Sequence, residues 1–254
     1  MIKSVSLPSK LQLIQFLWQH ILLFVSLYIM TLGVALCVRS NLGSSVISSI
    51  PMAFSIAGQE GLAPPLTIGG YTNIMNMILV VGQVLVLRRR FEPVQLFQLL
   101  IGFVFGSLID VNMYITSPLV CDTLPSQLLT QFAGCTVMAA GIALEVRCGS
   151  VTMPGEGFPV AISRVTGQPF PKVKIAVDVT LVVLAVVSCY CFWGAWQWNI
   201  IGIGTLFAMF YVGYIVKLLN PHMGWFDRLL GYRPGFRRYI YGLARYIHKS
   251  ASQS

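Results

Sequence analysis

The chain has 254 residues, of which 56% are hydrophobic and 10% are charged, with a mean hydropathy of +0.76 and a formal net charge of +9. Soluble domains carry roughly 25% charged residues, so this composition excludes an ordinary soluble protein and indicates a membrane protein. Apolar segments long enough to cross a bilayer follow one another along the chain, which favours a helical bundle over a β-barrel. The positive charge is typical of nucleic-acid binding in a soluble protein, but here the positive-inside rule explains it, and we expect no nucleic-acid partner.

The first half of the chain is predicted to form one membrane repeat, residues 18–116, after a cytoplasmic N-terminal segment, residues 1–17. Its full spans are expected at residues 18–38, 66–87 and 94–115. Between the first two spans, segment 40–58 has an apolar part that is interrupted by serines and Pro51, and it is too short to cross a bilayer. If this segment enters and leaves on one side, the three arginines at 88–90 lie in the cytoplasm with the lysines of the N-terminal segment. We therefore predict a re-entrant segment.

The second half repeats this arrangement in residues 128–219, beyond an outer loop, residues 117–127, that contains no Lys or Arg. Its full spans are expected at residues 128–146, 173–192 and 200–218. The Gly- and Pro-containing segment 148–168 is again too short to span, and we predict that it enters from the cytoplasmic side. Residues 220–254 combine apolar residues at helical spacing with many Arg and Lys, which predicts an amphipathic cytoplasmic tail on anionic inner-leaflet lipids. A helix that binds a partner protein is the alternative interpretation of this tail.

Two sequence offsets relate the halves and indicate an internal duplication. A shift of 108 residues pairs Gly33 with Gly141, Arg39 with Arg147, Pro51 with Pro159 and Ser55 with Ser163. A shift of 102 residues pairs Asn76 with Asp178, Leu79 with Leu181, Gly102 with Gly204 and Phe105 with Phe207. An odd number of crossings in each half inverts the second copy relative to the first. We therefore predict an all-α polytopic membrane protein with six full transmembrane helices plus two short broken, re-entrant segments in an inverted-topology repeat.

Small residues and cysteines have packing roles in this interpretation. Gly102 and Gly106 form a GxxxG pair, which predicts close approach of two helices. The six cysteines show no metal-binding spacing and are expected to be small apolar packing residues. A disulfide between Cys121 and either Cys189 or Cys191 stays open if these residues share an oxidising outer face.

The second repeat contains motifs that together resemble the YczE/YyaS/YitT group of bacterial integral membrane proteins. The motifs are Pro154-Gly155-Glu156-Gly157, Thr166-Gly167-Gln168-Pro169, Lys174 with Asp178, and Gly202-Ile203-Gly204-Thr205, with Asn41-Leu42-Gly43 as the matching element of the first half. The resemblance covers roughly residues 25–220 and implies a transporter or channel. This chain departs from the group at residues 44–48, where serines replace a Pro-Trp-Asp sequence and hydroxyls therefore replace a carboxylate.

Ionisable residues at membrane depth mark candidate functional sites, because a charge in a bilayer is costly. Glu145, Glu156, Lys174 and Asp178 qualify in the second half, and Asp110 qualifies in the first. Lys174 and Asp178 are four residues apart, so they share a helical face and are able to pair. A purely structural ion pair is an equally open interpretation.

The two short segments predict where a solute binds. A half-helix that ends within the membrane directs its free N–H groups and the positive end of its dipole at a ligand. The breaks are expected at residues 43–45 and 155–157, and the offset of 108 residues places Ser48 opposite Glu156. The predicted substrate-binding residues are Ser44, Ser45, Ser48, Asn73, Asn76, Glu156, Lys174 and Asp178. Close helix packing is the alternative role of the Gly and Ser residues.

The sequence therefore predicts a membrane transporter or channel for a small polar or ionic solute, with its site at the interface of two inverted repeats. It contains no Ser/His/Asp arrangement, metal cluster or phosphate-binding loop, so we predict no enzymatic activity, cofactor or metal site. We expect a multi-pass protein of the bacterial cytoplasmic membrane with both termini in the cytoplasm, and a homo-oligomer stays open. The alternative function is a non-transporting membrane scaffold or regulator that acts through the basic tail.

Overall fold

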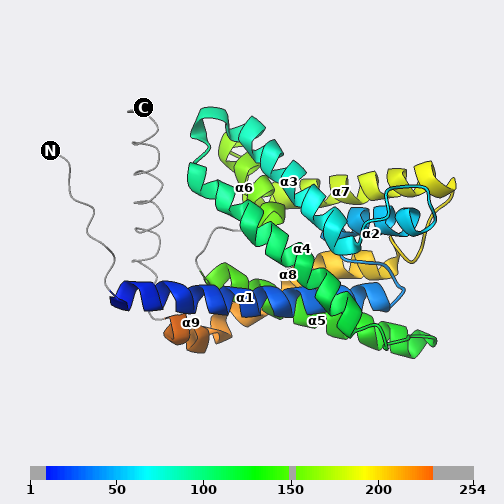
Figure 1. The fold of residues 1–254 in the computed structure, drawn as a ribbon, viewed down its shortest axis with the longest axis horizontal. Coiled ribbons are helices and arrows are strands. Elements are labelled where there is room, and N and C mark those ends of the chain that lie inside the picture. The colour runs from blue at the N-terminus through cyan, green and yellow to red at the C-terminus, as the bar shows by residue number, and fades with distance from the viewer. Residues whose placement is uncertain (1–9, 149–152, 231–254) are drawn as a thin grey trace.

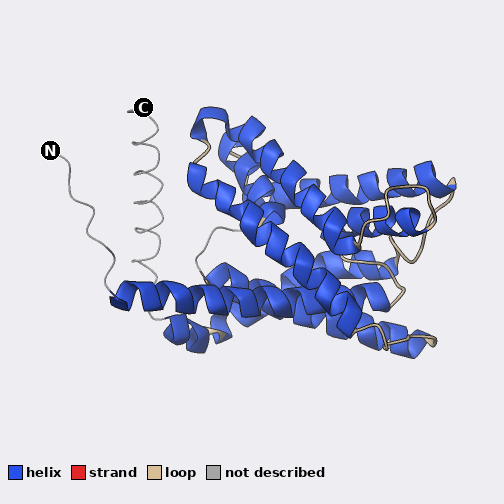
Figure 2. Ribbon diagram, in the orientation of Figure 1, coloured by secondary structure: helices blue, strands red, loops and turns tan. Residues whose placement is uncertain are grey.

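The computed structural model describes residues 10–148 and 153–230, and these residues form helices and loops without a β-strand (Figure 2). Six of the helices are long and apolar enough to cross a membrane, and each of these spans has 19 to 24 residues. The number of spans expected from the sequence is thereby confirmed. Predictions for residues 1–9, 149–152 and 231–254, which include most of the basic tail, lie outside the described residues.

The long helices lie close to the expected spans. They are α1 (Lys10–Arg39), α3 (Ile68–Leu87), α4 (Phe97–Ile115), α5 (Leu124–Arg147), α7 (Phe170–Trp193) and α8 (Ile203–Leu219). The largest difference is at the start of α1, which begins at Lys10 instead of residue 18. Its additional residues include Lys and Gln, which are good helix formers, so the helix extends past the apolar stretch. The remaining short elements are the 3-10 segments η1 (Arg88–Arg90), η2 (Pro93–Leu96) and η3 (Asn220–His222), and the helix α9 (Gly224–Leu230).

Two short helices, α2 (Val46–Gln59) and α6 (Pro154–Thr166), occupy the two segments that the sequence predicts to be broken. They have 14 and 13 residues, so each is about 20 Å long, whereas a bilayer core is about 30 Å thick. Figure 1 shows α2 and α6 toward opposite ends of the bundle. Their N-terminal ends meet, because a Cβ at Gly155 would lie 2.1 Å from Cδ1 of Ile47. The Ile47 side chain thus fills the space that glycine leaves free.

The long helices α1 and α5 pack together through glycines. A Cβ at Gly33 would lie 2.3 Å from the backbone nitrogen of Met138, and a Cβ at Gly141 would lie 2.5 Å from the backbone nitrogen of Met30. The offset of 108 residues exchanges these two contacts, since it relates Gly33 to Gly141 and Met30 to Met138. Two close contacts between α1 and α5 are therefore related by this sequence offset.

Replacing Gly33 or Gly141 by Ala is expected to destabilise the protein, because the added methyl group overlaps the backbone of the facing helix. Overpacking of this kind costs roughly 1–3 kcal/mol, so we expect the Tm to fall by about 5 °C. Thermal unfolding of the purified protein in detergent measures the effect. Gly213→Ala in α8 is the matched control, because no atom lies within 4 Å of its added Cβ. An equal Tm for Gly33→Ala and Gly213→Ala would contradict the predicted close packing.

The helix pairs that pack together occur as equivalent pairs in the two halves. Helix α1 packs on α4 as α5 packs on α8, α2 packs on α3 as α6 packs on α7, and α2 packs on α7 as α6 packs on α3. One pair differs: α3 packs closely on α4, whereas in the described part of the chain α7 has little contact with α8. The GxxxG pair mediates the α3–α4 contact as predicted, since Gly102 faces Asn76 and Gly106 faces Asn73.

All six cysteines lie within the described residues and are free thiols. Five of them are buried, in agreement with the predicted packing role, and Cys191 is exposed. Cys37 of α1 and Cys135 of α5 face each other, with their sulfur atoms 3.8 Å apart. No disulfide therefore joins Cys121 to Cys189 or Cys191 in this structure.

Candidate functional site

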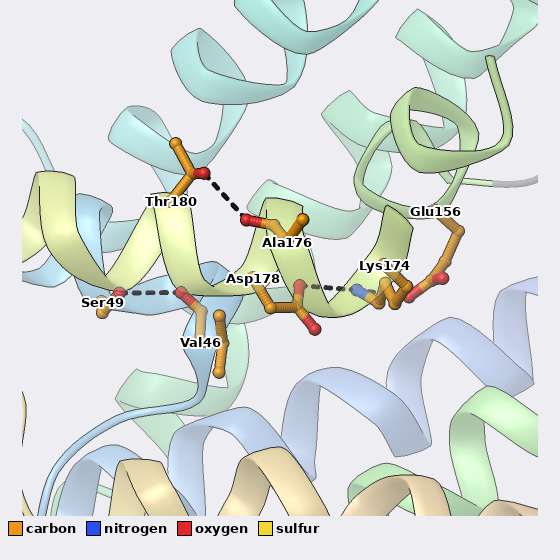
Figure 3. A network of polar contacts seen from close by, with 7 residues as sticks. All are labelled: Val46, Ser49, Glu156, Lys174, Ala176, Asp178 and Thr180. Carbon is orange, nitrogen blue, oxygen red and sulfur yellow. Dashed lines mark hydrogen bonds and ion pairs between the residues drawn. The ribbon is translucent and has the colours of Figure 1, made fainter. Parts of the chain in front are cut away.

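Lys174 forms two ion pairs where α6 packs on α7 (Figure 3). Its Nζ lies 3.2 Å from Oε1 of Glu156 and 2.9 Å from Oδ1 of Asp178. We call Glu156, Lys174 and Asp178 the charged triad. Their side chains are 29%, 27% and 15% exposed, respectively, although Lys174 and Asp178 belong to a helix that is apolar enough to span a membrane. The described helices thus bury the triad only in part.

The local sequence explains the position of the triad. Pro154 is at the start of α6, where its fixed φ angle suits a helix and its missing N–H removes no helical bond. Glu156 stands in the first turn of α6, where its negative charge interacts favourably with the helix dipole. Gly167 follows α6 in a left-handed conformation with φ of 70°, and the chain turns there so that α7 packs on α6. Lys174 and Asp178 pair as their spacing predicts.

Glu145 places a third carboxylate in this region. It lies in the last turn of α5 and is only 5% exposed. The backbone of Met153, directly before α6, donates a hydrogen bond to it, and its charge interacts with that of Glu156. Glu156 and Asp178 both pair with Lys174, so the charged triad carries one net negative charge when its three groups are ionised. The region therefore favours a cationic or proton-donating solute over an anion.

Two glutamines that the sequence analysis did not single out line the same end of α6. Nε2 of Gln83 donates to Oε1 of Gln98 at 2.8 Å, and both residues are buried. A Cβ at Gly157 would lie 2.8 Å from Oε1 of Gln98, so α6 approaches this pair closely. These glutamines could have been identified from the sequence as amide side chains within otherwise apolar spans, because such groups need hydrogen-bond partners at membrane depth.

The predicted serines fix the start of α2. Oγ of Ser45 lies 2.6 Å from Oγ of Ser48. Ser44 donates its backbone N–H, at 3.0 Å, and its hydroxyl, at 3.2 Å, to the carbonyl oxygen of Ile200, in the loop before α8. All three serines are buried. Ile47 of α2 packs against Gly155 of α6, and the Ser48 hydroxyl pairs with Ser45.

The predicted asparagines lie in the contact between α3 and α4. Nδ2 of Asn76 donates to the carbonyl oxygen of Gly102 at 3.3 Å, while its Oδ1 is buried without a hydrogen-bond partner in the structure. Asn73 packs against Gly106. The shift of 102 residues relates Asn76 to Asp178, which belongs instead to the charged triad. The structure thus brings together the three charged residues of the predicted site and holds the asparagines on another pair of helices.

Other charged residues have structural partners. Asp110 accepts hydrogen bonds from the hydroxyl of Thr67 at 2.7 Å and from the backbone N–H of Gly69 at 2.8 Å, so it caps the start of α3. Arg147 forms an ion pair with Asp227, which joins α5 to α9. Within residues 10–148 and 153–230, no group of three His, Cys, Asp or Glu residues is arranged to hold a metal ion.

Six apolar helices with a charged triad among them define a polytopic helical membrane protein. The chain belongs to DUF6198, a family of unknown function, and the family model matches residues 17–221. The matched region includes most of α1 and all of α2 to α8, whereas α9 lies beyond it. No curated protein and no solved structure matches the chain.

Proposed function

We propose that the protein is a transporter for a small polar or ionic solute and prefers a cationic or proton-donating one. The charged triad is the observation that carries this proposal. An ionisable group within a membrane span is costly and is usually retained for a function. Here, three such groups are paired but partly exposed, and they adjoin the meeting point of two short helices. The resemblance to the YczE/YyaS/YitT group supports the same function.

We also propose that α2 and α6 are re-entrant half-helices of an inverted repeat in the bacterial cytoplasmic membrane, with both termini in the cytoplasm. Their lengths, their places at opposite ends of the bundle and the contact of Ile47 with Gly155 support this arrangement. One sequence offset converts the contact of Gly33 with Met138 into the contact of Gly141 with Met30. This relation supports an approximate two-fold axis between the halves. In transporters with such repeats, the solute site lies at the repeat interface near the bilayer midplane.

The unequal packing of the halves supports alternating access. Helix α3 is packed on α4, whereas its counterpart α7 has little contact with α8 within the described residues. If α7 packed on α8 and α3 separated from α4, the protein would adopt a second state that opens on the other side of the membrane. The cycle would then alternate between a state with α3 packed on α4 and a state with α7 packed on α8.

Reconstitution into liposomes tests the proposed transport. Proteoliposomes and protein-free liposomes are mixed with hyperosmotic ammonium chloride, choline chloride, glycine, urea or potassium acetate, and reswelling is followed by stopped-flow light scattering. We expect the protein to accelerate reswelling with a cationic or uncharged polar solute more than with acetate. Reswelling rates equal to those of protein-free liposomes for every solute would contradict the proposal.

A further inference from the structure

A groove with a volume of about 940 Å³ lies between α3 and α7, with α2 and α6 contributing to its lining. Equivalent positions of the two halves line it, including Ile50 of α2 with Phe158 of α6, and Ile74 of α3 with Ala176 of α7. Almost all of its lining is apolar. The groove follows α7 over residues 173–188, which is a length of about 22 Å. We call this feature the α3–α7 groove.

Basic residues lie close along the chain to the lining residues at one end of the groove. They are Arg88, Arg89 and Arg90 directly after α3, Arg164 in the last turn of α6, and Lys172 at the start of α7. All five are exposed, and among the described residues none of them takes part in an ion pair. Glu92 is the one acidic residue in the connecting segments 88–96 and 163–172. We call these five basic residues the cationic end of the groove.

The other end of the groove carries no such charge. It is formed near the start of α3 and the end of α7, where Tyr71 and Ser188 are lining residues. The adjoining segments 59–67 and 193–203 contain no Lys or Arg. Glu60 lies there and accepts a hydrogen bond of 2.5 Å from Nε1 of Trp193. The groove is therefore apolar along its length and positively charged at one end only.

We propose that the α3–α7 groove binds one anionic phospholipid, with its acyl chains along the groove and its phosphate at the cationic end. Acyl chains match the apolar lining, and the basic residues begin where the helices leave the apolar stretch, which is the depth of lipid headgroups. Arg side chains bind phosphate through charge-assisted hydrogen bonds. A zwitterionic lipid would place its own ammonium group near the same basic residues, and the repulsion between these positive charges would weaken its binding.

Charge also decides against a second copy of this chain as the occupant. The chain has 17 Lys and Arg against 8 Asp and Glu, so a second copy would bring further positive charge to the cationic end. An anionic lipid instead neutralises it. This inference does not depend on transport, because it concerns the groove face of α7 and not the charged triad.

Native mass spectrometry of the full-length, delipidated protein in detergent tests the proposal. Phosphatidylglycerol or phosphatidylcholine is added at equal concentration, and the retained lipid is counted per protein. We expect about tenfold greater retention of phosphatidylglycerol. Arg164→Gln with Lys172→Gln should remove this preference, whereas Lys217→Gln with Arg228→Gln, an equal change of charge elsewhere on the exposed surface, should preserve it. 

A second pair of variants tests the apolar part of the groove. Ala176→Trp fills the groove and is expected to lower the retention of phosphatidylglycerol about tenfold, whereas Val179→Trp, on an exposed part of α7 outside the lining, should leave it unchanged. Equal retention of the two lipids by the unmodified protein would overturn the proposal. Unchanged retention in Ala176→Trp, or a lipid-free dimer in place of the lipid adduct, would also overturn it.

Discussion

Replacing Glu156 by Gln together with Asp178 by Asn is expected to reduce solute flux to the rate of protein-free liposomes. The two carboxylates hold Lys174 and supply the negative charge that attracts the solute, and the amides keep the side-chain shapes without that charge. Each single exchange is expected to lower flux at least tenfold. Stopped-flow light scattering with the solute that the unmodified protein transports measures the loss.

Stability separates a functional role of the triad from a structural one. Partly exposed ion pairs contribute about 1 kcal/mol or less, so the Tm of the double variant should lie within a few degrees of the unmodified value. Glu60→Gln removes an exposed carboxylate at the far end of α2 and should leave flux intact. If the double variant transports as fast as the unmodified protein, the triad is only a structural ion-pair network.

A disulfide between cysteines at positions 76 and 102 is expected to stop transport completely. The Cβ of Asn76 lies 3.2 Å from the position of a Cβ at Gly102, close to the roughly 3.8 Å that a disulfide needs. Asn76→Cys with Gly102→Cys, in a background with the native cysteines replaced by Ala, should therefore oxidise readily. The disulfide would lock α3 on α4, and reduction with dithiothreitol should restore flux.

A pair of positions in the second half provides a comparison experiment. The shift of 102 residues relates the Asn73–Gly106 contact to Ile175 and Ala208, and Ile175 is 60% exposed in this structure. Ile175→Cys with Ala208→Cys should cross-link only when α7 packs on α8, and so more slowly than the first pair. Full flux through protein with the 76–102 disulfide would show that α3 and α4 stay together during transport and would exclude the alternating cycle.

Hydropathy and charge predicted the number of spans, because a helix that crosses a bilayer needs a continuous apolar stretch. They also located α2 and α6, since each segment is too short and too rich in Gly, Ser or Pro to span. The pairing of Lys174 with Asp178 followed from their spacing of four residues on one helix. Each of these features depends on local sequence.

The contacts between helices were harder to predict, because sequence spacing does not fix the rotation of a helix about its axis. The offset of 102 residues relates Asn76 to Asp178, yet Asn76 lies against Gly102 of α4 and Asp178 pairs with Lys174. The offset of 108 residues relates Ser48 to Glu156 but does not reveal that Oγ of Ser48 pairs with Oγ of Ser45, one turn earlier on the chain. Such contacts depend on how α2, α3 and α7 are packed, which the two sequence offsets alone do not determine.

The first half of the chain has an amide, Asn76, where the second half has a carboxylate, Asp178. The two packed states of the proposed cycle are therefore chemically different. The amide of Asn76 donates a hydrogen bond to the carbonyl oxygen of Gly102. An ionised Asp178 has no hydrogen to donate to the carbonyl oxygen of Gly204, which accepts a hydrogen bond from Nε2 of Gln131 at 2.9 Å, so α7 cannot copy the amide contact of α3 while Asp178 is ionised. The second state of the proposed cycle would therefore be held by a different set of polar contacts from the first.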